Sequence, residues 1–406
     1  MKVLHLSYSD YEGAGGAGVA MYRLHRGLIN AGVDSSILSR MKSLKTDEST
    51  TIPRSATELF LKGITTKLGL NGLEGVGAFG VKRHPRYRDA DILNLHCIHS
   101  GYFNYLALPA LTRNKPTVWS HHDLWAITGH CSYSYDCTRW KTGCGKCPYP
   151  DHYPPIQRDA TALEWKLKNW AYQRSKLHVV VASQWFFNIM KESILQRFPI
   201  HRIPWGLDTA VFKPINKEEC RFVLGIPKDK KVLMFGVVNA DLHNKGGDLL
   251  MKAIEKLPES LKKDLVFLTI GHRGNDVFAK VGVPAIHLGY VLQDKFKAIA
   301  YSAADLYVLP TRAETFSLIA IESMACGVPV VSFAIGPIPE LVQNGQTGYL
   351  AQPENPDDLA KGIVQLMEDN ALRESLSAKC RSIVEREYTL ELQTQRYLDL
   401  YRKILA

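Results

Sequence analysis

Short apolar segments alternate with amphipathic helical segments along nearly the whole chain, and this alternation limits the fold more than any other feature. In the first half the strand patterns lie at residues 3–7, 35–38, 92–96, 117–120 and 179–182. In the second half they lie at residues 231–237, 265–270, 285–288, 306–309 and 329–333. Strands that alternate with helices form parallel sheets with crossover helices. The pattern predicts an α/β fold of two doubly wound, Rossmann-like domains that face each other across a cleft.

The domain boundary is predicted from length and from one interrupted segment. A chain of 406 residues is long enough for two domains. Residues 203–214 read Ile-Pro-Trp-Gly-Leu-Asp-Thr-Ala-Val-Phe-Lys-Pro, and such spacing of Pro and Gly is typical of a linker. We therefore predict a first domain at 1–207 and a second at 208–387, followed by a helix at about 388–406 with an apolar stripe.

Charge is distributed unevenly between the two halves. Residues 1–207 hold 26 Lys and Arg against 15 Asp and Glu, whereas residues 208–406 hold 24 against 25. The basic half favours an anionic partner. We do not expect nucleic acid, because no nucleic-acid-binding motif accompanies the charge. An anionic membrane surface fits better, because four apolar residues lie near one helical face beside two lysines: Leu59, Phe60, Ile64 and Leu68, with Lys62 and Lys67. The alternative is a surface helix packed on its own domain.

Nothing in the chain has the pattern of a membrane span or a signal peptide. No apolar run approaches the roughly 18 residues that a spanning helix needs. The first residues, Met-Lys-Val-Leu-His-Leu-Ser, open directly into a strand pattern. We expect a cytoplasmic protein that can reach the inner face of the cell membrane.

Two carboxylates, Glu314 and Glu322, follow the apolar strand at 306–309 in the segment Glu-Thr-Phe-Ser-Leu-Ile-Ala-Ile-Glu. Open α/β sheets bind ligands at the carboxyl edge, where Glu314 should lie. The next helix is predicted to begin near Phe316 or Ser317, and its free N–H groups can hold an anion. A diphosphate flanked by two sugars would need this set of groups.

Residues 13–18, Gly-Ala-Gly-Gly-Ala-Gly, match the dinucleotide fingerprint G-x-G-x-x-G. The fingerprint normally follows its strand at once, whereas residues 8–12 intervene here. The acidic residue expected after the second strand is replaced by Arg40, which leaves an NADP-dependent oxidoreductase as an alternative. The other interpretations are a Gly15–Gly16 turn that approaches a phosphate ahead of a helix at 19–29, and a purely structural turn.

Two further polar segments follow predicted strands. Lys245, within Asn-Lys-Gly-Gly-Asp at 244–248, comes after the strand at 231–237, where a lysine beside flexible glycines suits a pyrophosphate. His122, within His-His-Asp at 121–123, follows the strand at 117–120. Because histidine titrates near neutrality, it could share or shuttle a proton at a reacting centre. A structural histidine is the alternative.

Four cysteines with the spacing C-x5-C-x6-C-x2-C are the most unusual local feature: Cys131, Cys137, Cys144 and Cys147. In a reducing compartment, clustered cysteines indicate a metal before disulfides. Four thiolates suit a tetrahedral structural zinc ion that folds the loop. The alternative is a set of buried thiols.

Taken together, these segments resemble the retaining family-4 glycosyltransferases of the GT-B fold, over nearly the whole chain. The most specific part is Pro310–Val331, which is similar to the Glu-x7-Glu segment of that family, and Leu288–Val291 and Gly345–Leu350 also match. The blocks His122–Cys131 and Trp140–Pro148 resemble the branch that acts in colanic-acid and related exopolysaccharide assembly.

The resemblance implies a role for each site residue. Glu314 would bind hydroxyls of the donor sugar, Glu322 the nucleotide ribose, and Lys245 the diphosphate, while His122 would lie beside the transferred sugar. The other donor-binding residues would be Gly15, Gly16, Asn239, Gly271, His272, Tyr290, Arg312, Thr315, Phe316, Ser317 and Leu318. The family needs no catalytic metal, and its last helix crosses back onto the first domain.

The chain departs from the family pattern at two places. An Arg is usual after the first strand of the second domain, whereas this chain has Asn239, so Arg273 or Arg312 would have to supply the charge. Trp205 stands where Asn is usual. The function implied is retaining transfer of a sugar from a UDP- or GDP-sugar to a glycan or lipid-linked glycan acceptor in polysaccharide biosynthesis. The alternatives are a non-catalytic sugar-nucleotide-binding scaffold of a polysaccharide assembly complex and the oxidoreductase.

Overall fold

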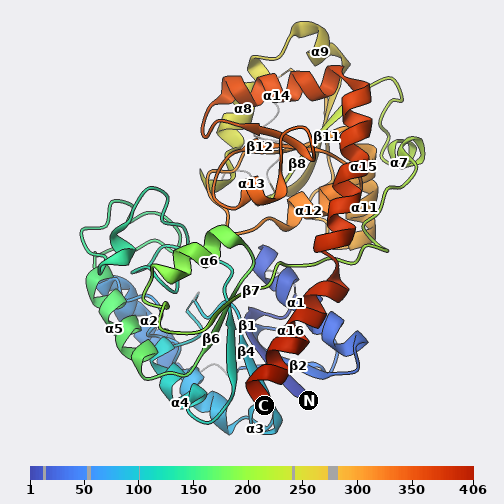
Figure 1. Cartoon of the computed structure of the whole chain (residues 1–406). Helices are drawn as coiled ribbons and strands as arrows, with labels where there is room; N and C mark the ends of the chain where they lie inside the picture. The colour runs from blue at the N-terminus through green and yellow to red at the C-terminus, as the bar shows by residue number, and fades with distance from the viewer. Residues whose placement is uncertain (12–14, 53–55, 100, 240–242, 273–281) are drawn as a thin grey trace. The chain divides into compact units, whose positions relative to one another are not determined.

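The computed structural model describes residues 1–11, 15–52, 56–99, 101–239, 243–272 and 282–406. The chain divides into two compact units. Unit 1 comprises Met1–Trp205 together with Glu391–Ala406, and unit 2 comprises Gly206–Leu390. Each unit is built on its own parallel sheet (Figure 1). The predicted α/β architecture of two Rossmann-like units is confirmed.

Unit 1 contains a seven-stranded parallel sheet of order β3-β2-β1-β4-β5-β6-β7. Its strands are β1 (Lys2–Ser9), β2 (Asp34–Met41), β3 (Ser49–Thr51), β4 (Ile92–Leu95), β5 (Thr117–Ser120), β6 (His178–Val181) and β7 (Ile200–Arg202). Its helices are α1 (Gly15–Asn30), α2 (Ala56–Leu68), η1 (Val76–Arg83), α3 (Pro85–Asp89), η2 (Tyr105–Ala107), α4 (Leu108–Thr112), η3 (Arg139–Lys141), α5 (Thr161–Gln173), α6 (Gln184–Lys191) and α16 (Leu390–Leu405).

Unit 2 contains a six-stranded parallel sheet of order β10-β9-β8-β11-β12-β13. Its strands are β8 (Lys231–Asn239), β9 (Leu265–His272), β10 (Ala285–His287), β11 (Leu306–Leu309), β12 (Val330–Phe333) and β13 (Gly348–Ala351). Its helices are α7 (Lys217–Val223), η4 (His243–Lys245), α8 (Gly247–Glu255), α9 (Glu259–Asp264), α11 (Asp294–Ala303), α12 (Leu318–Ala325), α13 (Ile338–Leu341), α14 (Pro356–Glu368) and α15 (Asn370–Glu387).

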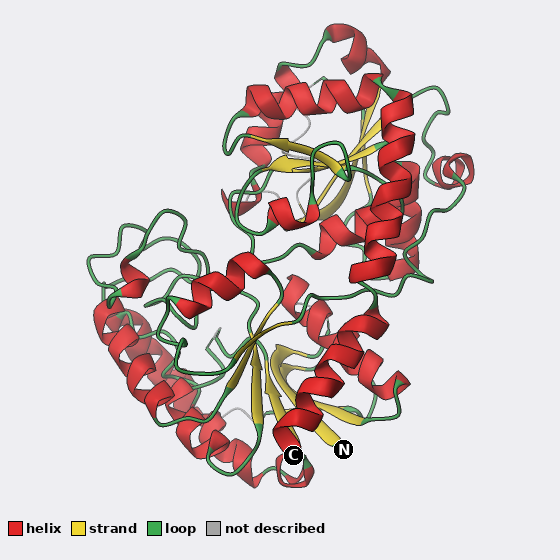
Figure 2. Ribbon diagram, in the orientation of Figure 1, coloured by secondary structure: helices red, strands yellow, loops and turns green. Residues whose placement is uncertain are grey.

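The central strands form where the sequence is continuously apolar. Every residue of β4, β5, β11 and β12 is buried. Helices cover both faces of a parallel sheet, so its strands need apolar side chains at every position and not at alternate ones. All ten predicted strands are present, and Figure 2 shows helices packed around each sheet.

The last helix packs on the sheet of unit 1. The Tyr397 hydroxyl lies 2.8 Å from Ser120 Oγ on β5, and Asn94 Nδ2 on β4 donates to the Tyr401 hydroxyl at 2.8 Å. Both tyrosines are buried. The end of the chain is therefore held against strands more than two hundred residues earlier, as the red helix α16 in Figure 1 shows.

Two helix predictions differ from the structure in their details. Helix α1 begins at Gly15 and not at Val19, because Gly15 can adopt a positive φ of 58° at the turn into the helix. Helix α12 begins at Leu318, one or two residues after the predicted start near Phe316 or Ser317. Within the described residues, no helix is long and apolar enough to cross a membrane.

Candidate functional site

The loop between β11 and α12 carries the two carboxylates at the carboxyl edge of the unit 2 sheet. Residues 314–318 are all buried. The Ser317 side chain accepts a hydrogen bond from Ala320 N at 3.3 Å and so caps α12. The cap fixes where the helix begins, shortly after Glu314 in the chain. The free N–H groups of this helix end are those for which the sequence predicts anion binding.

A second loop, which joins β8 to α8, is held tightly against the first. Gly246 has a φ of 67°, and a Cβ atom at that position would lie 1.8 Å from the carbonyl oxygen of Pro310. Thr311 Oγ1 and Arg312 N both donate to the Asn244 carbonyl, at 2.7 and 2.8 Å. Only glycine permits this approach, so Gly246 is what brings the neighbouring Lys245 to the edge occupied by Glu314.

Lys245 and Glu314 form an ion pair. Lys245 Nζ lies 2.7 Å from Glu314 Oε1, and the two side chains are 19% and 10% exposed. Sequence analysis assigns these residues to different parts of a donor, the diphosphate and the sugar. The structure places their charges in direct contact.

Glu322 lies one turn into α12 and is buried. Its Oε2 atom accepts a hydrogen bond from the Tyr301 hydroxyl of α11 at 3.1 Å. Sequence analysis missed Tyr301, which looks like an ordinary apolar position of a helix. It also missed Tyr307, whose hydroxyl accepts from Gly236 N at 2.9 Å and donates to Gly236 O at 2.6 Å.

Arg312, one of the two residues predicted to supply the charge absent at Asn239, is hydrogen-bonded to neighbours within unit 2. Its Nη1 and Nη2 atoms donate to the two carboxylate oxygens of Asp248 at 2.7 and 2.6 Å, and Nη1 also donates to His243 O. The guanidinium side chain is 6% exposed. In this arrangement Arg312 joins the two loops, and it could reach a phosphate only by giving up that bidentate pair.

The predicted base-binding residues lie around the end of β9. Gly271 N donates to the Gly289 carbonyl at 2.8 Å, which joins β9 to the segment that carries Tyr290. Tyr290 is 37% exposed. For Asn239 and His272 the structure describes only the backbone, and these two residues are paired between β8 and β9. Arg273 lies outside the described residues.

In unit 1, His122 ends a chain of three buried histidines. His122 Nε2 lies 3.0 Å from His96 Nδ1, and His96 Nε2 lies 3.0 Å from His5 Nδ1. The Trp205 ring packs on His122 with a centroid distance of 5.0 Å. Burial lowers the pKa of His122 to about 4. His122 is therefore neutral at pH 7. The sequence-based expectation that it titrates near neutrality is wrong.

The other two rings of the histidine chain are neutral as well. Burial lowers the pKa of both His5 and His96 well below the usual value. In a chain of neutral rings each contact joins an N–H donor on one ring to a bare nitrogen on the next. His5 Nε2, at one end, is buried without a hydrogen-bond partner among the described residues, and His122 Nδ1, at the other end, is buried as well.

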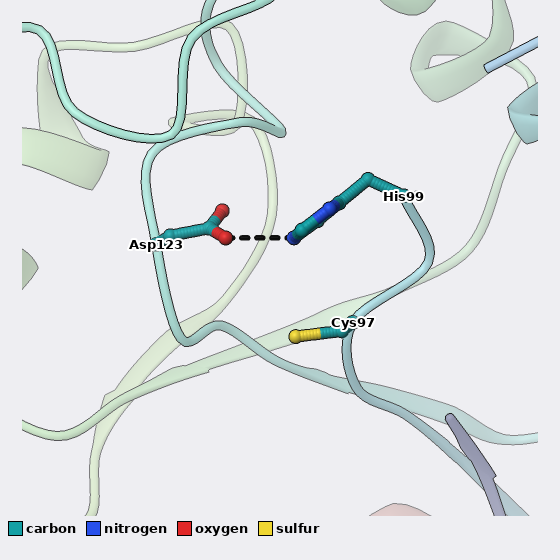
Figure 3. Close-up of side chains that lie close together, drawn as sticks. All are labelled: Cys97, His99 and Asp123. Atoms are coloured by element: carbon teal, nitrogen blue, oxygen red, sulfur yellow. Dashed lines mark hydrogen bonds and ion pairs between the residues drawn. The ribbon is translucent and has the colours of Figure 1, made fainter. Parts of the chain in front are cut away.

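Asp123, the neighbour of His122, pairs with a different histidine. Asp123 Oδ2 lies 2.7 Å from His99 Nε2, and Oδ1 accepts from Trp125 N at 2.9 Å. Burial opposes the charge on His99, but the Asp123 carboxylate outweighs it and raises the pKa of His99 well above its usual value. Figure 3 shows that Cys97 points toward this pair. Cys97, His99 and Asp123 form the one group of described residues with three potential metal-ligating atoms within 4.8 Å of one another.

The remaining predicted residues lie in unit 1. Gly15 and Gly16 are the first two residues of α1, whereas Gly13 and Ala14 lie outside the described residues. Arg40, on which an NADP-dependent enzyme would rely, is paired with Glu58 at 3.1 Å. The four cysteines predicted to bind zinc line one small cavity in the segment between β5 and α5: Cys131, Cys137, Cys144 and Cys147.

Two family profiles cover nearly the whole chain. The profile described as Glycosyltransferase Family 4 matches residues 14–211, and the profile described as Glycosyl transferases group 1 matches residues 216–382. These ranges correspond to most of unit 1 and most of unit 2. Both profiles describe glycosyltransferases, so they argue against the oxidoreductase alternative.

Similar curated proteins and solved structures agree with the profiles. D-inositol 3-phosphate glycosyltransferase 1 of Catenulispora acidiphila is 34% identical over 193 residues, which are 44% of this chain and 46% of that protein. Sulfoquinovosyl transferase SQD2 of Arabidopsis thaliana is 29% identical over 201 residues, 47% of this chain and 38% of that protein. The matched part is thus about half or less of the length of these relatives.

Solved structures resemble the chain over its full length. Sucrose-phosphate synthase of Thermosynechococcus elongatus superimposes with a TM-score of 0.72 at 20% identity, covering 100% of this chain and 99% of that one. Anabaena Alr3699/HepE in complex with UDP-glucose superimposes with a TM-score of 0.70 at 16% identity, covering 99% and 100%. The chain therefore belongs to the GT-B-fold glycosyltransferases that join a glycosyltransferase family 4 domain to a glycosyl transferases group 1 domain.

Proposed function

We propose that the protein transfers a sugar, with retention of anomeric configuration, from a nucleotide diphospho-sugar to a glycan or lipid-linked glycan acceptor. The observation that carries this proposal is the juxtaposition of Lys245, Glu314 and the capped N-terminus of α12 at one edge of the unit 2 sheet. A cation and a helix N-terminus bind a diphosphate, and a carboxylate beside them binds sugar hydroxyls. The solved complexes of Anabaena Alr3699/HepE contain UDP and UDP-glucose, which supports a nucleotide-sugar donor.

The proposed step needs little proton transfer by the protein. The bond between the anomeric carbon and the diphosphate oxygen breaks while the acceptor oxygen bonds to the same face of that carbon. The acceptor proton passes to the leaving phosphate oxygen. Lys245 and the N–H groups of α12 stabilise the charge that develops on the diphosphate, so no metal ion is required for this role. Glu314 then orients the sugar and does not attack it.

His122 fits this scheme as a neutral hydrogen-bonding group. Burial lowers its pKa to about 4, so the ring is neutral at pH 7. A neutral imidazole can bind a sugar hydroxyl without adding charge to the reacting centre. We assign the donor to unit 2, and His122 and the acceptor to unit 1.

The polysaccharide role rests on sequence blocks and on one exposed surface. The blocks His122–Cys131 and Trp140–Pro148 resemble the exopolysaccharide branch of the family. On α2, Leu59, Phe60, Ile64 and Leu68 are all exposed, Phe60 to 72%. Each of these apolar side chains thus leaves a large part of its surface open to solvent. An amphipathic helix with exposed lysines on a basic unit suits an anionic membrane, where a lipid-linked acceptor would lie.

The direct test is a panel of UDP- and GDP-sugars offered to the purified protein. Thermal shift identifies the donor that binds, and release of nucleoside diphosphate in the presence of acceptor measures transfer. The proton spectrum of the first product gives its anomeric configuration. Retention supports the proposal, and an inverted product contradicts the retaining mechanism. Binding of a donor without transfer or hydrolysis would instead favour the non-catalytic scaffold.

A further inference from the structure

The segment between β5 and α5, residues 121–160, contains only the short helix η3 (Figure 2). Connections longer than about 15 residues with so little secondary structure are uncommon in compact domains, and something specific usually holds them. This segment starts at the His121–Asp123 edge described above. Because His122 belongs to this segment, contacts that hold the segment in place also affect the surroundings of His122.

Four thiols of this segment converge on one cavity. Cys131, Cys137, Cys144 and Cys147 all line it, and none is in a disulfide. Thiols up to sixteen positions apart in the sequence thus line one cavity.

The backbone of the C-x2-C part is coiled in an unusual way. Four consecutive residues have positive φ angles: Gly143 (142°), Cys144 (53°), Gly145 (93°) and Lys146 (47°). For the two residues with side chains this conformation costs about 1 kcal/mol or more each. Gly145 N donates to Thr161 Oγ1 at 2.9 Å and Cys147 N donates to Asp159 Oδ2 at 2.7 Å. These two hydrogen bonds stabilise the backbone conformation of residues 143–147, in which Cys144 and Cys147 line the cavity.

Hydrogen-bond donors surround the cavity that the thiols line. Gly129 N donates to Cys144 Sγ at 3.2 Å, and an N–H donor to a ligand atom is a typical contact around a metal site. The Lys168 ammonium donates to the carbonyls of Trp125 and Thr128 at 2.7 and 3.0 Å, which holds the start of the segment. Burial raises the pKa of Cys131 and of Cys144, so these two thiols are neutral until a metal ion displaces their protons.

We propose that Cys131, Cys137, Cys144 and Cys147 bind one zinc ion through four thiolates, as a closed structural site. Tetrahedral sulfur coordination without an open position is what Zn²⁺ adopts in such sites. Each thiol releases its proton on binding, and no oxidation or reduction takes place. No three of these described sulfur atoms all lie within 4.8 Å of one another, so binding draws the loop inward.

The cluster of Cys97, His99 and Asp123 does not compete for this role. His99 and Asp123 already satisfy each other at 2.7 Å, and Asp123 also accepts from Trp125 N. His130 is the other nearby ligand type, with Nε2 at 3.2 Å from Cys147 Sγ and Nδ1 bonded to the Pro154 carbonyl. In this proposal His130 contacts a zinc ligand but does not bind zinc itself. Replacing His130 tests whether it is a ligand.

The test uses the full-length protein, loaded with zinc and freed of excess metal by gel filtration. Elemental analysis should find one zinc ion per chain. The four single Cys→Ser variants should each lose zinc to below about a tenth of that content under a weak chelator. Cys97→Ser and His130→Gln are the matched controls and should keep it.

Substitution with cobalt keeps the proposal testable if the serine variants do not fold. Wild-type protein should give the visible bands of tetrahedral cobalt with a strong sulfur-to-cobalt charge-transfer band in the near ultraviolet. Absence of stoichiometric zinc in folded protein, zinc retained by all four serine variants, or the weak spectrum of octahedral cobalt would each overturn the proposal. Loss of zinc from Cys97→Ser or His130→Gln would contradict the four-thiolate ligand set.

Discussion

Lys245 Nζ lies 2.7 Å from Glu314 Oε1, across two loops whose close approach depends on Gly246. In the proposed reaction the lysine serves the diphosphate and the carboxylate serves the sugar. Without donor, each charge compensates the other at a partly exposed position. A bound diphosphate would draw the lysine away and leave the carboxylate for the sugar hydroxyls. The ion pair thus holds both side chains close to where the donor needs them.

Glu314→Gln tests that view of the pair. The amide keeps the size of the side chain but removes its charge, so Lys245 is no longer held and the sugar loses a charged acceptor. We expect kcat for transfer to fall about 10- to 100-fold, equivalent to about 1.4–2.7 kcal/mol. Initial rates with saturating donor measure this. Glu368→Gln, an exposed glutamate on α14, is the control. An unchanged kcat in Glu314→Gln would contradict the assigned role.

Tyr301→Phe tests the orientation of Glu322. The substitution removes the hydroxyl that donates to Glu322 Oε2 at 3.1 Å and leaves the ring in place. We expect binding of UDP or GDP to weaken about 3- to 10-fold, because one buried hydrogen bond contributes about 1 kcal/mol. Calorimetric titration measures the affinity. Tyr397→Phe removes a similar buried hydroxyl contact in unit 1 and should leave the affinity unchanged. Equal losses in both variants would mean that the effect is only structural.

The buried histidines predict that unit 1 loses stability in mild acid. Burial lowers the pKa of His122 to about 4, below the value of about 6.5 in an unfolded chain. Between these two pH values the unfolded chain binds a proton that the folded unit does not, so the free energy of unfolding falls as the pH drops from 6.5 to 4. His122 alone accounts for about 3 kcal/mol over this range. Above pH 6.5 both states are neutral and this contribution is constant.

The chain supplies its own probe for this prediction. All seven tryptophans lie in unit 1: Trp119, Trp125, Trp140, Trp165, Trp170, Trp185 and Trp205. Urea unfolding followed by tryptophan fluorescence therefore reports on that unit. His122→Gln should flatten the pH dependence, whereas His243→Gln, at an exposed position of unit 2, should not. A wild-type free energy of unfolding that is constant from pH 6.5 to 4 would refute the prediction.

Phe60→Glu tests the membrane contact that we propose for α2. It places a charge at a residue that is 72% exposed beside other apolar side chains. We expect binding to anionic phospholipid vesicles to fall at least about tenfold, because apolar insertion and electrostatic attraction both weaken. Co-sedimentation measures the bound fraction. Phe222→Glu, at an 84% exposed phenylalanine of unit 2, should bind like the wild type. Vesicle binding that is equal in all three proteins would exclude α2 as the contact.

The sequence predicts the centres of both sheets but not all of their edges. Strands such as β5 and β11 are buried on both faces and therefore continuously apolar. The three missed strands, β3, β7 and β13, all lie at sheet edges. They are short, and Ser49-Thr-Thr and Ile200-His-Arg carry polar side chains that an edge strand tolerates. No continuous apolar pattern marks β3 or β7.

The candidate site could be predicted only in part for a different reason. Glu314, Glu322, Lys245 and His122 each follow a predicted strand, so their place at a carboxyl edge follows from topology. Their partners do not follow from it. The contact between His122 and His96 joins separate strands, and the hydrogen bond between Glu322 and Tyr301 depends on how two helices pack. The commitment of Arg312 to Asp248 likewise depends on loop geometry that no sequence pattern encodes.

The central claim is that the Lys245 and Glu322 side chains act on different parts of one nucleotide diphospho-sugar. The most direct measurement compares kcat for transfer and Kd for the nucleoside diphosphate in Lys245→Ala, Glu322→Gln and the exposed control Lys252→Ala. We predict that Lys245→Ala lowers kcat about 100-fold or more, because the leaving diphosphate loses its cation. We predict that Glu322→Gln weakens nucleotide binding about tenfold while Lys252→Ala changes neither. Kinetics and affinities unchanged in both Lys245→Ala and Glu322→Gln would contradict the account.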